Sequence, residues 1–148
     1  MTRREAREEA FYLVFEMSFG GNLDEILETA EQTKEMPLDP FTVQLAGHVR
    51  DHAEEIDQAI STHSKSWKIS RLSKVVTALL RMTIGEICYQ EDVPTSVSIN
   101  EAVELAKKYG GEDDSAYLNG VLGAFVRANP ALEPAPDRAS EIPDSVTE

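Results

Sequence analysis

Residues 93–127, VPTSVSINEAVELAKKYGGEDDSAYLNGVLGAFVR, constrain the fold of this chain more than any other segment. Apolar residues recur in it at the spacing of one helical turn, a pattern typical of amphipathic helices. A glycine-rich, acidic stretch at residues 110–117, GGEDDSAY, interrupts the pattern; we call it the acidic elbow. The segment therefore predicts two helices joined by this elbow, each with one apolar face turned to a common core.

Helical spacing also runs through the first part of the chain, and no strand-like alternation of useful length interrupts it. We predict an all-α fold with helices over about residues 3–19 and 23–34. Asp39 followed by Pro40 is typical of a helix start, and one long helix is predicted to carry apolar residues inward from Leu45 to Ile60. Ser70 is predicted to cap the fourth helix, which ends before Pro94.

The two helices of the opening segment have their own start and stop signals. Ser98 and Glu101 have capping-box spacing, and Gly110 is predicted to end the first of the two helices. Gly120 and Gly123 lower the helix propensity of the second, so we predict that another helix approaches it closely there.

Residues 129–148 differ from the rest of the chain, because they are rich in proline and acids and poor in apolar side chains. We predict that they form a disordered tail, and that residues 1–128 form one domain. The net charge is -13, so the average field of the protein repels nucleic acid. Binding to RNA would need a local basic patch.

Cys88 is the single cysteine, which excludes an intrachain disulfide. No apolar run is long enough to span a bilayer, and no signal peptide is evident, so we expect a cytoplasmic protein.

Nothing in the sequence points to catalysis. It contains no glycine-rich phosphate loop, no nucleophile elbow and no evident cysteine–histidine pair. His48 and His52 are one helical turn apart, but no third metal ligand is evident, so a surface histidine pair is the favoured interpretation. We predict no enzyme activity, no cofactor and no metal site.

Two groups of residues allow both a structural and a functional interpretation. Arg3, Arg4 and Arg7 share one helix face, where they are either solvated partners of neighbouring glutamates or a patch for phosphates. In the acidic elbow, Asp113 suits a helix start, and Tyr117 is either packed or available to stack on an unpaired base. The residues alone favour the structural interpretation of both.

A resemblance changes this balance. The stretches RREAREEAF, WKISRLSKVVTALLR, LLRMTIGEICYQEDVP and INEAVELAKKYGGEDDSAYLNGVL resemble the bacterial NusB family over nearly the whole ordered chain. The resemblance implies two packed helical subdomains and transcription antitermination without catalysis. It also implies binding of boxA, a single-stranded RNA element of ribosomal operon leaders and spacers, jointly with the ribosomal protein NusE. The implied larger complex contains NusA, NusG and RNA polymerase.

The resemblance also implies a site, carried over residue by residue. In this implied site, the first helix of the chain would contact phosphates, and the acidic elbow would lie on the RNA. The aromatic residue after the elbow would stack on a base. The implied RNA-binding residues are Arg3, Arg4, Arg7, Lys107, Glu112, Asp113, Tyr117 and Asn119. The alternative is a helical protein–protein adaptor that has lost RNA binding, and the choice between monomer and homodimer is left open.

Overall fold

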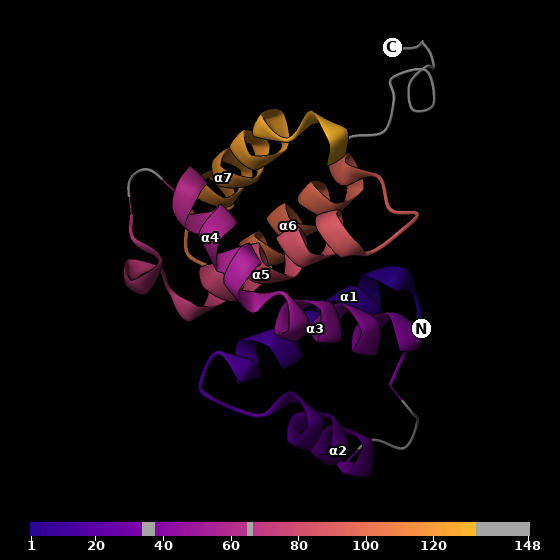
Figure 1. Cartoon of the computed structure of the whole chain (residues 1–148). Coiled ribbons are helices and arrows are strands. Elements are labelled where there is room, and N and C mark those ends of the chain that lie inside the picture. Colours follow the sequence, from indigo (N-terminus) through magenta and orange to yellow (C-terminus); the bar gives the residue numbers. More distant parts are fainter. Residues whose placement is uncertain (34–37, 65–66, 133–148) are drawn as a thin grey trace.

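The computed structural model describes residues 1–33, 38–64 and 67–132, and in these ranges it is helical without strands (Figure 1). The α-helices, in chain order, are α1 Arg3–Met17, α2 Leu23–Thr33, α3 Pro40–Asp51, α4 Ala53–His63, α5 Lys74–Tyr89, α6 Thr95–Tyr109 and α7 Asp114–Ala128. Two short 3-10 helices, η1 Ile69–Arg71 and η2 Pro130–Leu132, precede α5 and follow α7. The predicted all-α fold is confirmed.

Helix α5 lies at the centre of the fold. It contacts α1 and α3 on one side, and α4, α6 and α7 on the other. Figure 1 shows α1–α3 gathered in one half of the molecule and α4–α7 in the other. Leu79, Leu80 and Met82 of α5 are fully buried in the core that joins the two halves. The two helical subdomains therefore share one continuous hydrophobic core.

The helix starts agree only in part with the predicted caps. Asp39 caps α3 as expected, since its Oδ1 accepts a hydrogen bond of 2.8 Å from the Phe41 amide. Helix α5 is capped by Ser73 rather than Ser70, because Ile69–Arg71 first forms a separate 3-10 turn. Ser98 is not a cap either: α6 begins at Thr95 after Pro94, which places Ser98 inside the helix and buried.

The prediction of one long third helix is wrong, because the chain turns at His52 and forms α3 and α4 instead. Val49 and Ile56 stand on either side of this corner, and both pack on α5 at Gly85. A Cβ atom at Gly85 would lie 3.1 Å from Val49 Cγ2 and 3.6 Å from Ile56 Cδ1. The missing side chain therefore lets the α3–α4 corner sit directly on the central helix.

The predicted close approach at Gly120 and Gly123 is not found. Among the described residues, a Cβ at Gly120 would have no neighbour within 4 Å, and one at Gly123 would meet only the Arg127 side chain of the same helix. Gly110 does end α6, as predicted, with an amide hydrogen bond to the Ala106 carbonyl.

The folded body extends a few residues into the segment predicted to be a tail. Residues 130–132 form η2, and Thr95 Oγ1 donates a hydrogen bond of 2.9 Å to the Leu132 carbonyl. The remainder of the predicted tail, residues 133–148, lies outside the described residues. Within the part of the chain that the structure describes, no helix combines the length and apolar character needed to cross a membrane.

Candidate nucleic-acid interface

Side chains of α1 and α6 form a row of contacts, and the order of the contacting residues shows that the two helices run in roughly the same direction. Arg4 pairs with Glu101, and four residues further along α1 Glu8 pairs with Lys108. The Arg4 guanidinium donates to both carboxylate oxygens of Glu101, at 3.0 Å from Nε and 2.7 Å from Nη2. Lys108 Nζ lies 2.7 Å from Glu8 Oε2. We call this row the α1/α6 seam; it comprises Arg4, Glu8, Tyr12, Glu101, Lys108 and Tyr109.

Two tyrosines continue the seam toward the acidic elbow. The Tyr109 hydroxyl donates to Glu8 Oε2 and is hydrogen-bonded to the Tyr12 hydroxyl. Because a phenol has a single proton, Tyr12 is the donor to Tyr109. Their ring centroids are 5.8 Å apart in an edge-to-face arrangement, and 49% of Tyr12 is exposed. The seam thus presents an accessible aromatic ring beside exposed cations.

The ion pairs of the seam shift the pKa of their members. The hydrogen bond from Arg4 lowers the pKa of Glu101, and that from Lys108 lowers the pKa of Glu8. The hydrogen bond to Glu8 raises the pKa of Tyr109. Both carboxylates of the seam are therefore ionised at neutral pH, and the tyrosine is protonated.

Arg7 does not contribute to the exposed basic face on which the sequence placed it. Only 3% of its side chain is exposed, and its guanidinium donates to both oxygens of Glu86 on α5, at 2.9 and 2.7 Å. Ser98 Oγ donates a further hydrogen bond of 2.9 Å to Glu86. The predicted phosphate contact is corrected here, because the guanidinium is enclosed and its charge is already paired.

Arg3 and Lys107 are exposed, as a phosphate contact requires. The Arg3 guanidinium carbon lies 4.1 Å from the centroid of the Phe41 ring, an arrangement that orients the charge without neutralising it. Lys107 lies on the rim of a groove that Arg4 and Lys108 also line, and its nearest carboxylate oxygen, on Glu104, is 3.4 Å away. Arg4, Lys107 and Lys108 therefore line one groove, and Arg3 lies beside Arg4 toward α3.

The acidic elbow lies at the far end of the seam from the arginines. Because α1 and α6 run in the same direction, the elbow follows Tyr109 and lies beside Tyr12, which is two turns, about 12 Å, beyond Arg4. Glu112 and Asp113 are exposed there, and the Gly111 amide donates to Asp114 Oδ2 at 2.7 Å. The first helix meets the elbow through a tyrosine rather than through its arginines.

Tyr117 lies on a different surface from the seam. It is half-buried, its ring packs on the core, and its hydroxyl is hydrogen-bonded to Ser64 Oγ. It lines a groove with Trp67, Arg71 and Asp113. The structure thus gives Tyr117 the packed role that its sequence context favoured, with part of its edge accessible.

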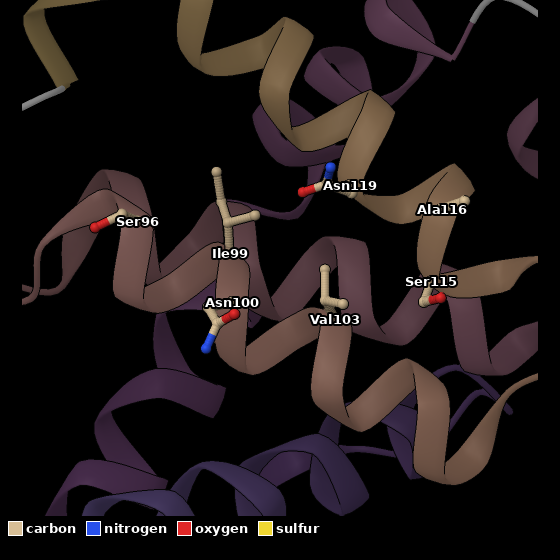
Figure 2. Close-up of a pocket in the computed structure, with 7 residues that line it drawn as sticks. All are labelled: Ser96, Ile99, Asn100, Val103, Ser115, Ala116 and Asn119. Carbon is tan, nitrogen blue, oxygen red and sulfur yellow. The ribbon is translucent and has the colours of Figure 1, made fainter.

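Asn119 lies in a third place, a shallow groove between α6 and α7 (Figure 2). In that view Ile99 and Val103 rise from α6 to form an apolar floor, with Asn100 beside them and Asn119 on the facing helix. Among the residues that the structure describes, no charged side chain lines this groove. The eight residues carried over from the resemblance are therefore divided among separate surfaces and one buried ion pair.

Sequence reasoning missed Tyr12, Glu8 and Tyr109 as members of the site. One signal was available: Arg4, Glu8 and Tyr12 follow each other at intervals of one helical turn and so share a face. The identity of the helix opposite that face was not readable, because Glu101 and Lys108 are about a hundred positions away along the chain.

Of the histidine pair, His52 makes both an aromatic contact and a weak polar contact. His52 stacks on Tyr89 with ring centroids 3.7 Å apart, and its Nδ1 lies 3.4 Å from Glu55 Oε1. In the described ranges, no group of three or more histidine, cysteine or acidic residues is arranged to hold a metal ion.

Comparison with known proteins agrees with this architecture. The NusB family model matches residues 4–127. Transcription antitermination protein NusB of Clostridium botulinum strain Kyoto is 38% identical over 143 residues, with 85% of this chain and all of that protein covered. The Oceanobacillus iheyensis protein of the same name is 40% identical over 127 residues, covering 85% of this chain and 99% of that protein.

Solved structures give the same result. NusB of T. maritima superposes with a TM-score of 0.76 at 30% identity, covering 86% of this chain and 92% of that one. A chain from a complex of the antitermination factors NusB and NusE with double-stranded RNA superposes with a TM-score of 0.75 at 28% identity, covering 86% and 99%.

The packed helices, the charged seam and these relatives define a small all-helical regulatory protein of transcription rather than an enzyme. The family match covers almost all of the described residues. The chain belongs to the NusB family of transcription antitermination factors.

Proposed function

We propose that this protein binds boxA-type single-stranded RNA along the α1/α6 seam, jointly with NusE. The observation that carries the proposal is the grouping of Arg4, Lys107 and Lys108 along one groove, with Arg3 beside Arg4 and the exposed ring of Tyr12 at the far end of the seam. In a chain with a net charge of -13, such a grouping supplies the local exposed cations that contacts with phosphates require. This chain is similar to a chain from a solved complex of NusB and NusE with double-stranded RNA, which supports NusE and RNA as partners.

The chemistry of the seam suits a single strand. Successive phosphates can lie along the exposed cations, while an unpaired base stacks on Tyr12, whose ring is at the end of the row. Beyond Tyr12 the strand would reach the acidic elbow, where the carboxylates of Glu112 and Asp113 can accept hydrogen bonds from base amino groups. Tyr117 and Asn119 are further proposed contacts, on the surfaces that flank the elbow.

NusE is proposed to supply the affinity that the seam lacks alone. A few phosphate contacts on an acidic protein give weak and salt-sensitive binding. A second protein bound beside the seam adds contacts to the same RNA and so raises the affinity of the pair. In the cell, the complex with NusE is proposed to join NusA, NusG and RNA polymerase.

A four-way titration tests the proposal. The full chain is titrated with boxA RNA and with a scrambled RNA of equal length, each with and without NusE. We expect weak binding by the protein alone, and much tighter binding to boxA when NusE is present. Equal affinity in all four titrations would overturn the proposal.

One observation favours the alternative of a protein–protein adaptor. Arg4 and Lys108 are both already paired with carboxylates, so the seam carries little free charge. The double charge reversal Arg3→Glu with Arg4→Glu separates the two functions, while Lys68→Glu with Arg127→Glu is the matched control. If the complex of NusE with the Arg3→Glu, Arg4→Glu variant still retains RNA, the adaptor is favoured. Arg7 is left unchanged because its reversal would disrupt the core.

The oligomeric state bears on this site as well. A homodimer that covered the seam would mask its cations, so RNA binding and dimerisation would then compete. Sedimentation of the free protein and of the protein with boxA RNA distinguishes a stable dimer from a monomer that takes up RNA.

A further inference from the structure

The exposed cations of the seam stand above recessed carboxylates. The Arg4 side chain is 68% exposed and its partner Glu101 only 12%. One turn further along α1 and two turns further along α6 the helices exchange roles: Lys108 on α6 is 61% exposed, while Glu8 on α1 is 22% exposed. Each cation therefore faces solvent, and each carboxylate is held beneath it between the two helices.

The groove formed by these pairs has no net formal charge. Its lining has equal numbers of cations and carboxylates: Arg4, Lys107 and Lys108 against Glu8, Glu101 and Glu104. The two recessed carboxylates have lowered pKa values because of their hydrogen bonds to Arg4 and Lys108, so the balance holds at neutral pH. Long-range attraction of an arbitrary polyanion to this groove is consequently weak.

Donor groups for a phosphate remain available despite the pairing. Glu101 accepts from Nε and Nη2 of Arg4, which leaves Nη1 unused by that pair. Lys108 gives one of its protons to Glu8 and has others to donate. A phosphate can thus be accepted, but it gains little Coulomb energy because each cation is already neutralised.

From this geometry we propose that Glu8 and Glu101 are specificity-determining residues, which suppress binding of unselected RNA by neutralising the cations of the seam. The inference rests on the proposed function. An RNA with a base placed on Tyr12, or one also held by NusE, obtains enough additional contacts to bind. An RNA that offers only phosphates does not bind, because the neutralised cations give its backbone little attraction. Affinity for this site must come from contacts with bases rather than from backbone charge.

The test is the double variant Glu8→Gln with Glu101→Gln in the full chain. The amides keep the size and hydrogen-bonding oxygen of the carboxylates but remove their charge. The control is Glu28→Gln with Glu54→Gln, which makes the same change in net charge at exposed positions on α2 and α4. Thermal melts establish that all three proteins are folded, and each is titrated with boxA RNA and with scrambled RNA over a range of salt concentrations.

We expect the seam variant to bind scrambled RNA about tenfold more tightly than the unmodified protein, since two like charges beside the phosphates are removed. The affinity for boxA should rise less, so that the ratio of the two affinities falls. The dependence of log K on log salt should steepen by about 0.7 for each released cation. The control variant should change the affinities for the two RNAs equally and only slightly.

Other outcomes separate this inference from the proposed function. Suppose that the unmodified protein prefers boxA. If the seam variant then has an unchanged affinity for scrambled RNA, or a lower affinity for both RNAs, the carboxylates only hold the cations in position and the inference is wrong. If neither protein binds either RNA, with or without NusE, the proposed function fails and the inference fails with it.

Discussion

The guanidinium of Arg7 and the carboxylate of Glu86 form a two-pronged ion pair in the interior, with 3% and 1% of their side chains exposed. The pair connects α1 to the central helix α5, and Ser98 extends it to α6. One arginine of the first helix thus joins the two subdomains, while its neighbours Arg3 and Arg4 face solvent.

Removal of one partner of this pair should be strongly destabilising. Arg7→Met leaves the Glu86 carboxylate buried without its cation, and we expect a loss of about 3–5 kcal/mol in the free energy of unfolding measured with urea. Arg4→Met, which removes an exposed pair, should cost much less, because solvent screens the Arg4 charge. Similar losses for the two variants would contradict the structural role of Arg7.

The ion pairs of the seam should stabilise the fold at neutral pH and lose this effect only in acid. The pKa values of Glu8 and Glu101 are lowered in the folded state, so the unfolded chain takes up protons first as the pH falls. The stabilisation is complete above the ordinary glutamate pKa of about 4.3 and is lost as the pH falls through the lower folded-state values.

Urea unfolding between pH 7 and pH 3 measures this effect. The variant Glu8→Gln with Glu101→Gln should lose less free energy over the acid range than the unmodified protein, and the difference should be small because Arg4 and Lys108 are exposed. Parallel pH profiles of the two proteins would show that the pairs do not stabilise the fold.

Gly85 and Gly120 should respond oppositely to alanine. At Gly85 the new methyl group would press on Val49, which is itself buried, and overpacking of this kind costs about 1–3 kcal/mol. At Gly120 the methyl group meets nothing within 4 Å, so the gain in helix propensity should stabilise the protein by about 1 kcal/mol. Melting temperatures of the two variants check the prediction; a shift of the same sign in both would contradict it.

Tyr12 should contribute to RNA binding through its ring. Tyr12→Ala should weaken boxA binding by the NusE complex by about 1–3 kcal/mol, the range found when one stacking aromatic is removed. Tyr12→Phe keeps the ring and should retain most of the affinity. Phe19→Ala is a suitable control, because that ring is also exposed but lies beside Lys74, away from the seam. Equal losses for Tyr12→Ala and Tyr12→Phe would assign the effect to the hydroxyl network instead.

Local signals predicted some helix boundaries correctly, although the caps predicted at Ser70 and Ser98 are wrong. The start of α3 at Asp39 and the end of α6 at Gly110 follow from cap chemistry, which involves only neighbouring residues. The turn at His52 has no such local signal. It depends on the packing of Val49 and Ile56 against Gly85, which is remote along the chain.

The candidate site shows the same difference between local signals and long-range packing more clearly. The sequence by itself determined an all-helical chain, an acidic surface and a first helix with three arginines on one face, because composition and the period of a helix are local properties. Only the tertiary structure decided that Arg7 is enclosed with Glu86, that Arg4 and Lys108 stand over carboxylates of the neighbouring helix, and that Tyr12 rather than Tyr117 completes the row. Those differences arise because burial and charge pairing depend on which helices meet, and α1 meets its partners only after the whole chain has folded.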